Sequence, residues 1–106
     1  MNMDRTQKVR LISEALALTK AHPANGAYAK DAHGLMTEPL FPDAVCWCGL
    51  GALRKVFGAK MGELPGKLGL DQDEFGDLAD GIIRANDVGT EADLDAAFER
   101  LAEAAK

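Results

Sequence analysis

The sequence has few aromatic residues and no excess of basic ones. Aromatic residues make up 6% of the chain, so the core has to be built mostly from aliphatic side chains. Twelve Lys and Arg against seventeen Asp and Glu give a formal net charge of −5. Because nucleic-acid binding depends on a basic face, we expect no direct contact with nucleic acid. An acidic surface usually serves solubility, and it would also suit a partner with a basic groove.

Long apolar runs are also missing. No segment approaches the roughly 20 apolar residues of a membrane helix, and the N-terminal segment has no signal-peptide-like run. The two cysteines, Cys46 and Cys48, are separated by one residue, a spacing at which helical side chains point in different directions. We therefore expect a cytoplasmic protein that has no membrane contact and keeps both thiols free.

The 106 residues have the length and composition of one globular domain, which we take to span residues 1–106. Apolar residues recur at helical spacing in four segments. The segments run from Asp4 or Thr6 to Ala21, from Asp43 to about Phe57, over "QDEFGDLADGIIRAND" after Asp71, and from Glu91 to about Ala104. The buried face of the third is expected to consist of Phe75, Leu78, Ala79, Ile82, Ile83 and Ala85. The pattern predicts a mainly α, compact four-helix domain.

The connections between these segments contain strong turn signals. Two short extended pieces, Tyr28–Lys30 and Leu35–Thr37, flank "DAHG" and predict a small β-hairpin between the first and second helices. The glycine-bearing "GAKMGELPGKLG" predicts a loop with at most one helical turn. "NDVG" is expected to end the third helix, because Asn and Asp readily turn the chain. Thr90 and Asp93 resemble a capping box for the last helix.

The segment "PDAVCWCGLGALRKVFG" contains both cysteines and could carry chemistry. If Asp43 caps the helix, Cys46 and Cys48 lie in its first turn, where unpaired N–H groups can lower a thiol pKa. A cysteine-dependent enzyme or thiol sensor would use Cys48 as nucleophile, His33 as base, and Asn86 or Asp87 to orient the base. Helical spacing instead favours Cys48 as a buried, unreactive side chain, since Cys is among the residue types most often buried.

Other ligand-binding patterns are incomplete. The C-x-C spacing lacks a second ligand pair, so we predict no metal site. "GLGAL" has Arg54 where a dinucleotide fingerprint needs a third glycine, so we predict no cofactor. Gly49, Gly51 and Ala52 are better explained by close packing of this helix at the centre of the domain.

Two stretches of the chain resemble a known family. They are "YAKDAHGLMTEPLFPDAVCWCGLGALRKVFG" and "IIRANDVGTEADLDAAFERLA", and the resemblance covers most of residues 8–103. The family consists of small bacterial and bacteriophage proteins of unknown function with a W-C-x-x-G-A-L helix followed by an N-D segment. The matching positions are Tyr28, Gly34, Pro39, Trp47, Cys48, Gly51, Ala52, Leu53, Asn86, Asp87 and Thr90. Cys46 departs from the family pattern, and Asn25-Gly26 stands where many members have a Trp.

The resemblance implies a similar fold layout and no particular activity, and its bacteriophage members imply an accessory or host-interaction role. We therefore expect a non-enzymatic helical module that binds another protein and is encoded by a phage or prophage. An inhibitor of a host defence nuclease, with acidic side chains in a basic groove, would be one form of it. The cysteine-dependent enzyme or thiol sensor that uses Cys48 is the alternative.

Overall fold

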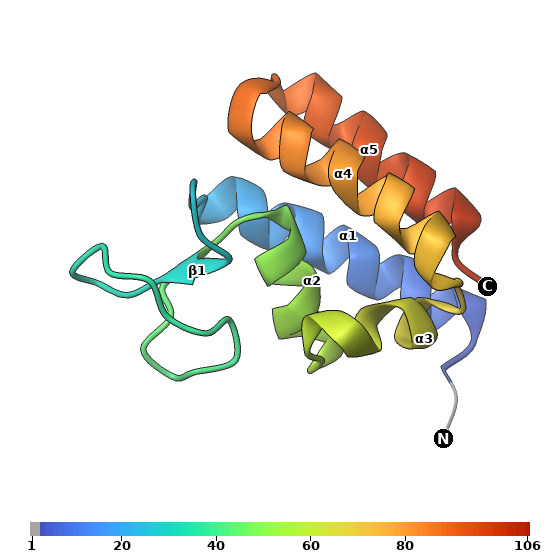
Figure 1. Ribbon diagram of the computed structural model, residues 1–106, viewed down its shortest axis with the longest axis horizontal. Helices are drawn as coiled ribbons and strands as arrows, with labels where there is room; N and C mark the ends of the chain where they lie inside the picture. Colours follow the sequence, from blue (N-terminus) through green and yellow to red (C-terminus); the bar gives the residue numbers. More distant parts are fainter. Residues whose placement is uncertain (1–2) are drawn as a thin grey trace.

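Helices dominate the computed structural model, which describes residues 3–106 (Figure 1). In chain order the elements are α1 (Arg5–Ala21), β1 (Ala29–Lys30), β2 (Cys46–Trp47), α2 (Gly49–Phe57), the 3₁₀ turn η1 (Met61–Glu63), α3 (Leu64–Leu68), α4 (Gln72–Val88) and α5 (Glu91–Ala104). The mainly α prediction is confirmed. The predicted number of helices is wrong, because residues 3–106 contain five α-helices and not four.

Side-chain caps mark the starts of three helices, and the predicted starts of α4 and α5 are correct. The Asp4 carboxylate accepts a hydrogen bond from the backbone N–H of Gln7 at 2.8 Å, and α1 begins at the next residue after Asp4. Asp71 starts α4 in the same way. Thr90 and Asp93 form the predicted capping box of α5. These bonds link residues three apart in the sequence, so the sequence alone indicates them.

The central helix is α2, as the run of small residues predicts. Every residue from Gly49 to Arg54 is buried. α1 packs against α2 and α5, while α4 packs against α5 and also contacts α2. α4 and α5 lie side by side, and the segment that contains β1 projects away from the helices (Figure 1). Side chains from all of the long helices meet in one core that includes Ile12, Leu53, Ile82, Phe98 and Leu101.

The predicted start of α2 at Asp43 is wrong. Cys46 and Trp47 form β2, which pairs antiparallel with β1, and the helix begins only at Gly49. On its other side, Trp47 donates a backbone hydrogen bond to the carbonyl of His22 (2.8 Å) and accepts one from Ala24 (3.2 Å). Because His22 pairs with its N–H and Ala24 pairs with its C=O, the extended conformation satisfies the backbone polar groups of Trp47 without a helix.

The predicted hairpin is only partly present. Lys30 forms an isolated antiparallel bridge with Met36, so the chain does reverse at the expected place. The paired strand of Ala29–Lys30 is nevertheless Cys46–Trp47 and not Leu35–Thr37. The chain from Leu35 to Thr37 is instead the start of a long loop that leads to β2.

The segment between α2 and α4 contains more helix than predicted. η1 and α3 occupy most of it, and Pro65 stands in the first turn of α3, where proline is well tolerated. Leu64 and Leu68 are completely buried. Their spacing of four residues places both on one face of α3, so the short helix is held by the core rather than by its own propensity.

The first turn of α2 approaches another backbone very closely. A Cβ atom at Gly51 would lie 1.8 Å from the carbonyl oxygen of Tyr28. The same carbonyl accepts a hydrogen bond of 3.2 Å from the backbone N–H of Cys48. A side chain at position 51 would therefore push the helix away from β1 and break this contact.

We predict that Gly51→Ala lowers the free energy of unfolding by about 3 kcal/mol, since overpacking against backbone cannot be relieved by a rotamer change. Gly76→Ala is the matched control, because a Cβ at Gly76, in the second turn of α4, would meet nothing within 4 Å. That variant should be neutral or more stable by up to about 1 kcal/mol. Urea denaturation followed by circular dichroism measures both values. Equal stability of the two variants would contradict the close contact.

Candidate functional site

A groove with a volume of about 720 Å³ opens beside the N-terminus of α2. Its lining comes from the turn at residues 26–28, the loop at residues 36–41, the first turn of α2 and the last turns of α4. The larger apolar side chains of the lining are those of Tyr28, Met36, Pro39, Phe41, Leu50 and Ile83. This volume is in the range of sites that bind small molecules or the side chains of a peptide.

Several of the apolar side chains in the groove are exposed to solvent. The exposed fractions are 42% for Tyr28, 75% for Met36, 55% for Phe41 and 41% for Ile83. The helical pattern of α4 placed Ile83 on the buried face, and this prediction is wrong. A group of exposed apolar side chains around a groove is typical of a binding surface.

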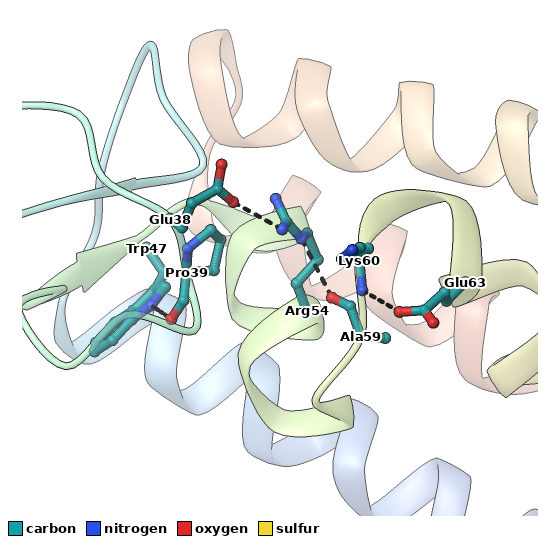
Figure 2. Close-up of polar contacts among 7 residues, drawn as sticks. All are labelled: Glu38, Pro39, Trp47, Arg54, Ala59, Lys60 and Glu63. Carbon is teal, nitrogen blue, oxygen red and sulfur yellow. Dashed lines mark hydrogen bonds and ion pairs between the residues drawn. The ribbon is translucent and has the colours of Figure 1, made fainter.

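The wall of the groove is fixed by a buried arginine of α2. Figure 2 shows Arg54 donating from Nη2 to Oε2 of Glu38 at 2.9 Å and from Nε to the carbonyl of Ala59 at 3.3 Å. Its guanidinium carbon also lies 5.6 Å from the centre of the Tyr28 ring. Arg54 therefore positions two groove residues, Glu38 and Tyr28, from within the core.

Two further hydrogen bonds hold the loop at residues 36–43. The indole N–H of Trp47 donates to the carbonyl of Pro39 at 3.1 Å (Figure 2). The hydroxyl of Thr37 donates to the carboxylate of Asp43 at 2.8 Å. Both Trp47 and Pro39 are buried, so this side of the groove is anchored to the core rather than free in solvent.

Asn86 lines the groove, and its side chain links α4 to other segments. Its Oδ1 accepts from the backbone N–H of Gly49 (3.2 Å), and its Nδ2 donates to the carbonyl of Ala24 (3.1 Å) and to Oδ1 of Asn25 (3.2 Å). The amide is thus occupied by two other segments, the start of α2 and the turn that contains Ala24 and Asn25, and it does not bond its own backbone. The helix does end within "NDVG" as predicted, at Val88 with Gly89 as its C-cap, but Asn86 and Asp87 still belong to α4 and do not close it.

Cys48 is the N-cap of α2 and also lines the groove. Its sulfur accepts a weak hydrogen bond from the backbone N–H of Gly51 at 3.4 Å. Burial raises the pKa of the Cys48 thiol, the nearby charge of Asp87 adds to this, and hydrogen bonds from Gly51 and Leu50 oppose it only in part. The expectation that the helix N-terminus lowers this pKa is wrong, since desolvation of the thiolate is the larger effect.

His33 does not join Cys48 at the groove. It is exposed in the turn after β1, where the Asp31 carboxylate accepts hydrogen bonds from the backbone N–H groups of His33 (2.8 Å) and Leu35 (3.0 Å). The structure therefore brings Cys48, Asn86 and Asp87 to one groove and places His33 outside its lining. The proposed base and nucleophile are not assembled.

Sequence analysis missed the apolar members of the site. Tyr28, Met36 and Phe41 lie in segments that the sequence assigned to a hairpin and its connection. The available signal was the density of apolar residues in "GLMTEPLFPDAV", where two prolines exclude both a regular helix and a central strand. Apolar residues in such a segment either cover a core or form a surface site.

Over residues 3–106, no group of three or more His, Cys, Asp or Glu side chains is placed to hold a metal ion. In the same part of the chain, no helix combines the length and the apolar character needed to cross a membrane. Comparison of the chain with protein-family models, curated proteins and solved structures found no match.

We predict that Cys48 in the native protein reacts with iodoacetamide at least about tenfold more slowly than in the unfolded chain, because little thiolate is present. Peptide mass mapping after alkylation at pH 7.5 with and without urea measures both rates. A native rate equal to the unfolded rate would restore the cysteine-dependent alternative.

The raised pKa also predicts a pH dependence of stability. Above about pH 8.5 the thiol ionises in the unfolded chain but stays protonated in the native protein, so the native state binds more protons and loses stability as pH rises. Two proteins are compared in a Cys46→Ser background, one with Cys48 and one with Cys48→Ser. Between pH 7 and pH 10, the protein that keeps Cys48 should lose more stability than the Cys48→Ser protein. Urea titrations at both pH values measure it. A constant difference would exclude the pKa shift.

Proposed function

We propose that the protein is a non-enzymatic binding module that accepts an apolar segment of another protein in the groove beside α2. The observation that carries the proposal is the set of exposed apolar side chains Tyr28, Met36, Phe41 and Ile83 around one groove. Apolar burial is the main driving force of protein association. A site of this kind needs no cofactor and no reacting group.

The rigidity of the groove wall supports the same proposal. Arg54 holds Glu38 and Tyr28, while Trp47 holds Pro39. A surface that is already ordered loses little conformational entropy when a partner binds, and more of the interaction energy then appears as affinity. These contacts run between the core and the groove, so the surface is set by folding and not by the partner.

The arrangement around Cys48 favours binding over cysteine chemistry. A nucleophilic thiol needs a thiolate or an adjacent base. Burial instead raises the pKa of the Cys48 thiol, and the amide of Asn86 is already occupied by Gly49, Ala24 and Asn25. His33 lies outside the groove lining.

The biological setting that we propose is a phage or prophage accessory protein that acts on a host protein in the cytoplasm. The net charge of −5 supports a basic partner, of which a host defence nuclease with a basic groove is one form. An acidic surface raises the rate at which a basic partner is encountered, while the apolar groove supplies the affinity.

The proposal predicts that peptides selected from a random twelve-residue library on the native protein bind through Ile83. Ile83→Ser should weaken their binding at least about tenfold, because a central apolar contact is lost. Val88→Ser is the matched control, since Val88 is 82% exposed on the same helix and does not line the groove. Fluorescence anisotropy of labelled peptides measures the affinities. Peptides that bind the Ile83→Ser protein as tightly as the native one would exclude the groove as the site.

A further inference from the structure

We propose that the segment bound in the groove carries a basic residue next to its apolar anchor, and that this residue pairs with Asp87. This inference rests on the proposed function and adds the chemistry of the partner. It follows from the charged side chains of the lining. They are two carboxylates, Glu38 and Asp87, with no Lys or Arg among the lining residues.

Asp87 is available for an incoming cation. It is exposed on the last turn of α4, directly after the anchored Asn86. The ion pairs within residues 3–106 use the carboxylates of Asp95, Glu38 and Glu74, and none uses Asp87. A carboxylate beside the last carbonyl groups of a helix is in an unfavourable field. A cation placed next to it would relieve that repulsion.

Glu38 adds to the negative character of the opening although it is paired. The Arg54 side chain that holds it is only 10% exposed, whereas the Glu38 side chain is 57% exposed. The positive member of the pair is therefore buried, and the negative member faces the solvent. A basic residue that approaches the groove meets the carboxylate first.

The field of Asp87 also reaches the groove lining. The charge of Asp87 is one of the causes that raise the pKa of the Cys48 thiol at the start of α2. Cys48 and Asp87 come from different helices, and both line the groove.

A second copy of the chain is a poor occupant for this groove. In a two-fold dimer the same surface of each copy would meet, which brings Glu38 and Asp87 of one copy towards those of the other. Two chains of net charge −5 also repel one another before contact. The charge pattern instead complements a basic, apolar segment of a different protein.

The experiment uses the peptides selected on the native protein. We expect them to be enriched in Lys or Arg near their apolar residues. Asp87→Asn should weaken the binding of such a peptide about three- to tenfold at low salt and reduce the salt dependence of its affinity. Asp77→Asn is the control, because Asp77 is exposed on the same helix and is absent from the groove lining. It should leave the affinity unchanged.

A double-mutant cycle assigns the contact to one pair of residues. Replacing the basic residue of the peptide by Gln should weaken binding to the native protein but have almost no further effect on the Asp87→Asn protein. Thermal unfolding of Asp87→Asn should occur at the native temperature or slightly above it, since the change removes a charge from the unfavourable end of a helix dipole.

The outcomes separate the two proposals. Selected peptides that depend on Ile83 but lack basic residues, or that bind Asp87→Asn as well as the native protein, would overturn the role of Asp87 and leave the groove intact. Peptides that do not depend on Ile83 would overturn the binding groove itself. Self-association that disappears in Ile83→Ser, measured by light scattering, would assign the groove to a second copy and overturn the basic partner.

Discussion

The first turn of α2 lies directly against the backbone carbonyl of Tyr28, and this contact positions both the core and the groove. It requires a residue without a side chain at Gly51, where a Cβ would lie 1.8 Å from that carbonyl oxygen. On the inner side, the close approach lets the consecutive buried residues of α2 enter the core. On the outer side, it fixes Tyr28 and Cys48 at the groove. Packing and the candidate site therefore depend on the same contact.

Arg54 extends this dependence from the core to the surface. A buried guanidinium is costly unless its charge and N–H groups are satisfied. Here the carbonyl of Ala59 and the carboxylate of Glu38 accept hydrogen bonds from Arg54 (Figure 2), and the ring of Tyr28 adds a cation–π contact. Two of these partners line the groove, so the same contacts stabilise the buried charge and order the binding surface. This coupling explains why a loop that contains two prolines and little regular structure can form a defined wall.

Cys48 illustrates how two general rules can compete at one atom. A position at a helix N-terminus favours thiolate, and burial favours the neutral thiol. The sulfur does receive a hydrogen bond from Gly51, yet loss of solvation is larger and the negative charge of Asp87 acts in the same direction. The thiol is consequently a capping group for α2, and its partial burial makes it less reactive than the motif suggests.

The sequence by itself determined the ends of α1, α4 and α5 that carry capping residues, the buried position of α2, and the mainly helical class. These features arise from residues three or four apart, or from a run of small side chains, and so can be recognised locally. Only the tertiary structure decided that Cys46–Trp47 is a strand, that Leu64 and Leu68 form a helix, and that Asn86 is a link rather than a helix terminator. Each depends on partners far away in the chain, such as His22 for Trp47 and Gly49 for Asn86. The groove is likewise decided by the tertiary structure, because its lining comes from four separate segments that share no local pattern.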